Sequence, residues 1–139
     1  MKTLILSNTD KRQFGANVAL TLDYTDAAAA TSTVAVNALS VLAGTKVRVV
    51  GMKLNTAFDI TGTGNMTLSV GDGDSATALM TAQQLALDDT EILYYAGGSS
   101  KVYLADDTVD LFWTASSMAY TVGSVTLYLS VENLNDLPK

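Results

Sequence analysis

The chain lacks two side chains on which much enzyme chemistry depends. Its 139 residues include no cysteine and no histidine. Disulfides, thiolate or imidazole metal sites, and Ser-His-Asp or Cys-His nucleophile systems therefore cannot form within it. We expect no catalytic residue, no metal and no cofactor, and hence a protein that is not an enzyme.

Basic residues and long apolar runs are also scarce. Eight lysines and arginines stand against 14 acids, which gives a net charge of −6 and argues against a nucleic-acid partner. The opening apolar run, Leu4 to Leu6, is shorter than the roughly 7 residues of a signal-peptide core and the roughly 20 of a membrane span. We expect a soluble protein without a standard export signal or a membrane partner.

Alternating apolar residues are the main feature that is present. Val50, Met52 and Leu54 share one face of a predicted strand that begins near Lys46, and Met66, Leu68 and Val70 share one face of a second. Between them lies ITGTGN, residues 60–65, whose glycines and asparagine tolerate positive φ. The sequence therefore predicts that these two strands pair as a hairpin.

Further strands follow from the same alternation. They are predicted at residues 17–23, 33–42, 92–95, 101–104, 109–114 and 125–132, with the last two exposing one face to solvent. Residues 92–95 and 101–104 flank AGGSS and form a second predicted hairpin, whereas residues 76–87 fit either a short helical turn or a strand.

About eight short strands with frequent turns, and a single proline at Pro138, predict an all-β fold. We expect an antiparallel β-sandwich of the jelly-roll type, with an immunoglobulin-like sandwich as the alternative. A hydrophobic content of 48% suits one compact domain, which we assign to residues 17–139, preceded by an N-terminal arm at residues 1–16.

Three segments carry a resemblance to a known family. They read LAGTKVRVVGMKLNTAFD, NMTLSVGDGDSATALMTA and DDTVDLFWTASSMAYTVGSVTLYLSVE, and lie between Leu42 and Glu132. Their pattern resembles the jelly-roll decoration, or cement, proteins of tailed bacteriophages. The GDGDS turn is its most distinctive part.

The resemblance implies a structural virion protein. Such a protein is made in the host cytoplasm, binds the major capsid protein on the outer surface of the capsid and stabilises the head. It also implies a homo-oligomer, for which we expect a trimer, with a dimer as the alternative. Related sandwiches occur in phage fibres and tail appendages, so a module that binds a host receptor or glycan is the alternative function.

Lys2, Lys11 and Arg12 form a small basic group in this acidic chain. Solvated chain ends often carry such charges, but a basic arm can also reach an acidic neighbour. We take these three residues as candidate capsid contacts. Tyrosines 94, 95, 103, 120 and 128 offer rigid amphipathic area either for an interface or for the edges of the core.

The aspartates of GDGDS allow two interpretations. Asp72 and Asp74 are spaced to offer oxygens to a calcium ion, or to cap a hairpin end as an Asx turn. We prefer the turn because few further ligands follow. The remaining acids cluster at predicted strand ends (Asp88, Asp89, Glu91, Asp106, Asp107, Asp110), where solubility and turn formation explain them better than glycoside hydrolysis does.

Overall fold

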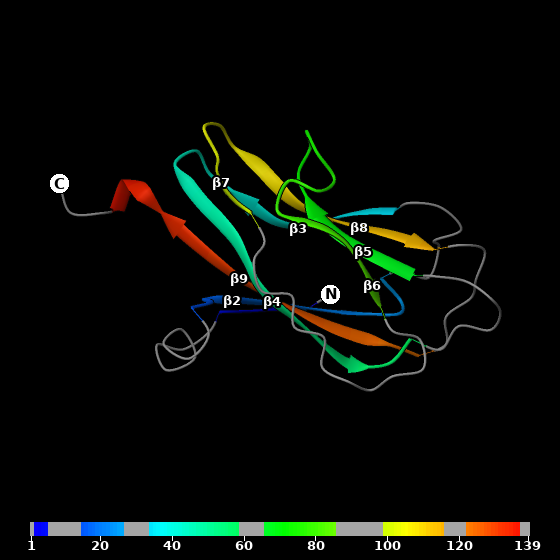
Figure 1. Cartoon of the computed structure of the whole chain (residues 1–139). Helices are drawn as coiled ribbons and strands as arrows, with labels where there is room; N and C mark the ends of the chain where they lie inside the picture. The colour runs from blue at the N-terminus through cyan, green and yellow to red at the C-terminus, as the bar shows by residue number, and fades with distance from the viewer. Residues whose placement is uncertain are drawn as a thin grey trace.

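The computed structural model describes residues 2–5, 15–26, 34–58, 66–85, 99–115 and 122–136 (Figure 1). Regular structure in these segments consists of strands and one short 3-10 turn, η1, at Leu134–Asp136. The strands are β1 Lys2–Ile5, β2 Val18–Asp23, β3 Val34–Val41, β4 Thr45–Thr56, β5 Met66–Gly71, β6 Met80–Leu85, β7 Ser100–Val102, β8 Asp107–Ala115 and β9 Ser124–Asn133.

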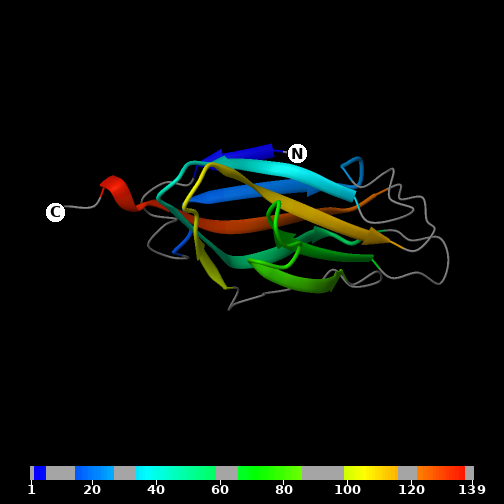
Figure 2. The same cartoon turned by 90° about the horizontal axis from the view of Figure 1, so that it is seen from above.

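These strands form two antiparallel sheets that face each other (Figure 2). One sheet has five strands in the order β1-β2-β9-β4-β7, and the other has four in the order β3-β8-β5-β6. Each sheet turns one apolar face toward the other, which buries both faces in a common core. The predicted all-β antiparallel sandwich is confirmed.

The strand pairs nest inside one another. β5 pairs with β6, β4 with β7, β3 with β8 and β2 with β9, so the chain pairs outward from its middle like one long hairpin folded across the two sheets. This nesting is the pairing expected of a jelly-roll-like sandwich. It differs from the immunoglobulin arrangement, in which strands A, B, E and D form one sheet and C, F and G the other.

The predicted hairpin between the strands around Lys46–Leu54 and Met66–Val70 is wrong. β4 pairs with β7 and β9, whereas β5 pairs with β6 and β8 in the opposite sheet. Both strands carry an apolar face, and placing them in opposite sheets lets the two faces pack against each other across the core. The ITGTGN segment lies outside the described residues. Residues 92–95 also lie outside the described residues, so the second predicted hairpin, between 92–95 and 101–104, stays a prediction. The described part of the latter strand, β7, pairs with β4.

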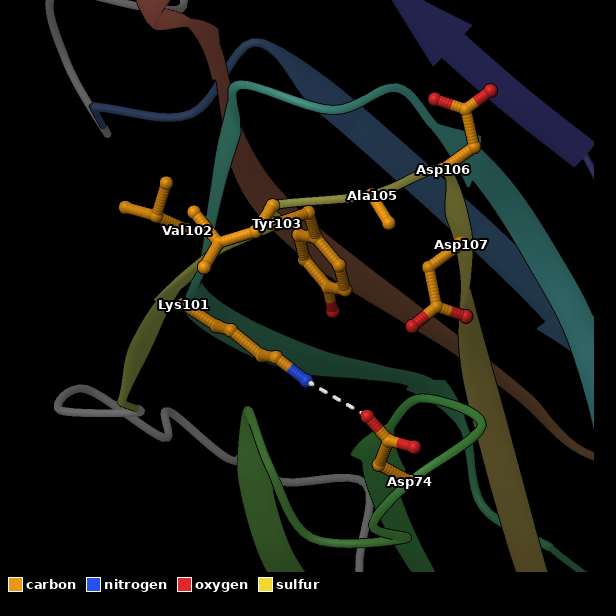
Figure 3. A pocket seen from close by; sticks show the side chains of 8 residues that line it. Asp74, Lys101, Val102, Tyr103, Ala105, Asp106 and Asp107 are labelled. Atoms are coloured by element: carbon orange, nitrogen blue, oxygen red, sulfur yellow. Dashed lines mark ion pairs between the residues drawn. The ribbon is translucent and has the colours of Figure 1, made fainter.

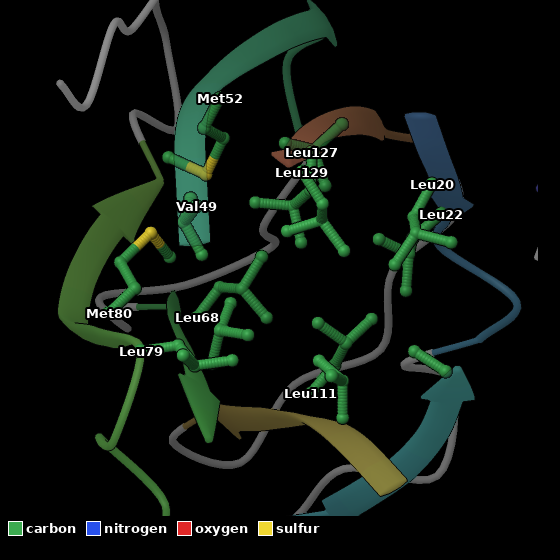
Figure 4. Close-up of a cluster of buried hydrophobic side chains, with 14 of the residues drawn as sticks. Leu20, Leu22, Val49, Met52, Leu68, Leu79, Met80, Leu111, Leu127 and Leu129 are labelled. Carbon is green, nitrogen blue, oxygen red and sulfur yellow. The ribbon is translucent and has the colours of Figure 1, made fainter. Parts of the chain in front are cut away.

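The core holds the residues that alternation selected on β8 and β9. Val109, Leu111 and Trp113 are fully buried, as are Val125, Leu127 and Leu129, while Val131 is partly buried. Figure 4 shows leucines of β2 and β9 directed toward Leu68 and Leu111 of the four-stranded sheet. Leu68 and Val70 are buried as predicted.

One expectation on β4 fails because of a β-bulge. The register against β9 shifts between Val49 and Gly51, so Val50 is the extra residue. Val47 and Val49 before the bulge, and Met52 and Leu54 after it, all face the core. Val50, predicted to share the face of Met52 and Leu54, is only partly buried.

The first residues belong to the five-stranded sheet. Lys2–Ile5 pair with Val18–Thr21 of β2 and form an edge strand. The predicted N-terminal arm therefore begins with a strand that is hydrogen-bonded to the sandwich. No helix within the described residues is long and apolar enough to cross a membrane.

Candidate functional site

The GDGDS segment forms a turn that is held by the first of its aspartates. Oδ1 of Asp72 accepts hydrogen bonds from the backbone N–H groups of Asp74 and Ser75, each at 3.0 Å. The chain folds back so closely that a Cβ at Gly71 would collide with the backbone carbonyl of Ser75. The predicted Asx turn is confirmed, and its geometry requires glycine at position 71.

The second oxygen of Asp72 is bound from the facing sheet. Lys101 of β7 donates to Oδ2 at 2.6 Å and the Tyr103 hydroxyl donates at 3.3 Å. The Asp72 side chain is completely buried, so burial by itself would raise the pKa of its carboxyl. Hydrogen bonds from Lys101, Ser75 and Asp74 outweigh burial and hold the pKa of Asp72 below its ordinary value.

The two donors respond to the same carboxylate. The hydrogen bond to Asp72 raises the pKa of Lys101, so its ammonium stays charged. Burial, followed by the negative charge of Asp72, raises the pKa of Tyr103, which keeps its phenol protonated as a donor. Tyr103 is only 2% exposed and also lies under the Lys101 ammonium, which is 5.0 Å from its ring centroid. Of the two interpretations of the tyrosines, the core one holds for Tyr103.

A pocket of about 280 Å³ opens beside this cluster (Figure 3). Asp74 and Asp107 line it together with Lys101, and carboxylate oxygens of Asp72, Asp74 and Asp107 all lie within 4.8 Å of one another. Lys101 Nζ is 2.6 Å from Asp72 and 3.9 Å from Asp74, so a lysine ammonium supplies the positive charge that this acidic cluster needs. We assign Asp72 to the turn and the ion pair that joins the two sheets.

The other acids serve local structure or lie outside the described residues. Asp106 accepts a hydrogen bond from the backbone of Ala43, and Asp107 accepts one from the backbone of Thr108. Asp110 is buried, and its Oδ1 has no hydrogen-bond partner in the part of the chain that the structure describes. Asp88, Asp89 and Glu91 are not among the described residues.

A second charged region lies on the outer face of the five-stranded sheet. Lys46, Arg48 and Lys53 of β4 lie opposite Glu132, Ser130 and Thr126 of β9. Within the described segments, none of the three basic side chains makes an ion pair or a side-chain hydrogen bond. We call this surface, formed by Lys46, Arg48, Lys53, Tyr128, Ser130 and Glu132, the cationic face, because its three cations outnumber its one acid.

Two shallow hollows meet on the cationic face. One, of about 200 Å³, is lined by Lys46, Arg48, Ser130 and Glu132. The other, of about 370 Å³, shares Ser130 and Glu132 and continues to Gly15 and Asn17. Because they share Ser130 and Glu132, the two hollows are neighbours on the outer face of β9: the first extends to β4 and the second to the segment before β2.

Hydroxyl and amide groups cover the neighbouring part of the same sheet. Thr126 is linked to Thr21 at 3.0 Å and accepts a hydrogen bond from Asn55 at 2.8 Å. These neighbours leave Thr126 only 7% exposed, although the alternation predicted a solvated position.

The sequence-predicted contact residues are only partly placed. Lys2 lies on β1, at the edge of the five-stranded sheet, while Lys11 and Arg12 lie outside the described residues. Of the tyrosines, Tyr128 lies on the outward side of β9, while 94, 95 and 120 lie outside the described residues. Sequence reasoning missed the cationic face, for which the only linear signal was Lys46 and Arg48 two residues apart on one strand.

Comparison with known proteins found no relative of this chain. No protein-family model matches the sequence, and no similar chain was found among curated proteins or solved structures.

Proposed function

We propose that the chain is a structural virion protein that decorates the capsid of a tailed bacteriophage. It binds the outside of the major capsid protein shell as a homo-oligomer, a trimer in preference to a dimer, and stiffens the head. The observation that carries this proposal is the coincidence of the resembling stretch, Leu42 to Glu132, with strands β4 to β9, which contribute to both sheets of a jelly-roll-like sandwich.

The chemistry of the described residues supports a binding role. The buried carboxylate of Asp72 binds Lys101 and Tyr103 and so joins the two sheets. A protein that stabilises a shell must bury surface on its neighbours without reacting with them. A sandwich whose buried Asp72 holds its own turn, and whose three β4 cations make no ion pair within the described residues, meets this requirement.

The test is to mix the purified chain with expanded, undecorated heads of the phage that encodes it. We expect binding that saturates at a fixed number of copies per head, visible by electron microscopy as density at local symmetry axes. Decorated heads should withstand higher temperature before they release DNA, and light scattering of the free protein should report a trimer.

The contrary results are equally definite. If the chain is found only on tails or fibres of virions, the alternative function in receptor or glycan binding replaces the proposal. If it does not bind expanded heads, decoration is excluded.

A further inference from the structure

We propose that the cationic face is the docking surface of this protein and that its target is an acidic protein surface. This inference rests on the proposed function for the identity of the target, the outer surface of the capsid shell. It adds which face of the sandwich makes the contact and what charge the shell must present there.

The distribution of charge is the first argument. The chain has 14 acids and only eight basic residues, so its cations have many potential partners. Lys101 takes such a partner in Asp72, at 2.6 Å. The three cations of β4 take none within the described segments, although Glu132 lies directly across from Lys46 in the register. Cations left unpaired on one face of an acidic protein complement a negatively charged partner.

One wall of the second hollow is held in place before any partner binds. The side-chain amide of Asn17 donates to the carbonyl of Val131 and accepts from its N–H, both at 2.7 Å, which fixes one wall. The Arg48 side chain reaches across β9 toward that wall. Its Nη2 atom would lie 3.7 Å from a Cβ placed on Gly15, the residue next to Asn17's neighbour Ala16. A wall that is already fixed loses little conformational entropy on binding, whereas the lysine and arginine side chains are ordered by the partner.

The residue types on the cationic face favour a protein partner over a glycan. Tyr128 is partly buried and lies on the outward side of β9, between Ala19 of β2 and Gly51 of β4. It also lies between Arg48 and Lys53 along the sheet. Tyrosine and arginine are the residues that most often dominate protein interfaces. A carboxylate of the partner can accept two hydrogen bonds from one guanidinium such as that of Arg48.

A charge-matched pair of variants tests the inference. The first, Lys46→Gln/Arg48→Gln/Lys53→Gln, removes the charge of the cationic face. The control, Thr81→Glu/Ala82→Glu/Thr114→Glu, adds three negative charges at exposed positions of the four-stranded sheet. Both change the net charge of −6 by three, to −9, so a difference between them reports the location of charge.

Binding to expanded heads is measured for both variants at low and at physiological salt, with heparin as a second probe. We expect the first variant to bind heads about tenfold more weakly, with a smaller salt dependence, since it loses about three exposed ion pairs. The control should bind like the wild type. Equal affinity of the two variants overturns the inference while wild-type binding still supports decoration. Loss of heparin binding with unchanged head binding assigns the face to an acidic glycan and also overturns it.

Discussion

The two charged regions of this molecule differ in how their charges are used. In the cluster around Asp72, one carboxylate receives four hydrogen bonds from groups of both sheets and is fully buried. On the cationic face, three basic residues have no ion pair within the described segments. A buried charge is costly to leave without its partner, while an unpaired charge at the surface is available to a binding partner.

The largest effect on stability is expected on the inner side of the five-stranded sheet, which packs in the core. Leu127 is fully buried, so Leu127→Asp should lower the free energy of unfolding by more than about 4 kcal/mol by burying an unpaired charge. Arg48→Glu, on the exposed side of the neighbouring strand, should change it by no more than about 0.5 kcal/mol. Urea denaturation of both variants checks this, and equal midpoints would show that the register of β4 against β9 is wrong.

Removing Asp72 should lower the free energy of unfolding by less than Leu127→Asp does, but by more than any substitution on the cationic face. Asp72→Ala leaves two backbone N–H groups of the turn and the Lys101 ammonium without their acceptor. We expect a loss of about 2 kcal/mol, moderated because Lys101 is 33% exposed and water can solvate it. The matched control, Asp74→Ala, removes a carboxylate that is 88% exposed and should be nearly neutral in thermal unfolding. A neutral Asp72→Ala would contradict the assigned role.

Acid should weaken the paired region selectively. The pKa of Asp72 is lower in the folded state than its ordinary value of 3.8, so the charged carboxylate stabilises the fold above that pH. This contribution is lost as the pH falls below 3.8 toward the folded-state pKa. Asp72→Asn should therefore show a smaller drop in melting temperature between pH 5 and acid than the wild type does. Asp74→Asn should keep the wild-type drop, and identical profiles for Asp72→Asn and wild type would refute the linkage.

The smallest stability effect is expected from neutralising the cationic face. Lys46→Gln/Arg48→Gln/Lys53→Gln removes three charges that make no ion pair within the described segments, so its free energy of unfolding should stay within about 0.5 kcal/mol of the wild type. Calorimetry at neutral pH measures this. A large loss would show that these cations stabilise the sandwich and are not reserved for a partner.

The predicted basic group of the N-terminus needs a different test from simple truncation. Deleting residues 1–12 would remove β1 and expose the edge of β2, so lost head binding could follow from lost structure. Substituting Lys11 and Arg12 with glutamine leaves β1 in place. If these residues anchor the arm, head binding should weaken by a few fold at unchanged melting temperature. Unchanged binding would remove them as contacts.

Local pattern was sufficient for much of the fold. Alternation located β2, β3, β5, β8 and β9 and identified the inward residues of β8 and β9. The Asx turn at Asp72 was also predictable, because aspartate and glycine at that spacing satisfy backbone donors within a few residues. These features depend on interactions between near neighbours in the chain, which the sequence records directly.

Tertiary structure alone decided which strands pair and which charges meet. The side-chain amide of Asn17 makes two hydrogen bonds to the backbone of Val131, 114 positions away in the sequence. No local pattern in either segment predicts this pairing. Met66–Val70 follows the Lys46 strand closely in the sequence but joins the opposite sheet. In this arrangement the apolar faces of the two strands pack against each other across the core.

The cationic face shows the same division most clearly. Lys46 and Arg48 are an even number of residues apart and share a face by simple alternation, but Lys53 is an odd number away, so strict alternation would place it on the opposite face from them. The bulge at Val50 inserts one unpaired residue and returns Lys53 to the outer face, opposite Thr126. The sequence by itself determined an all-β protein with period-2 strands and a capped turn. The bulge, the sheet assignment and the gathering of unpaired charge required the folded chain, since each depends on a partner strand distant in sequence.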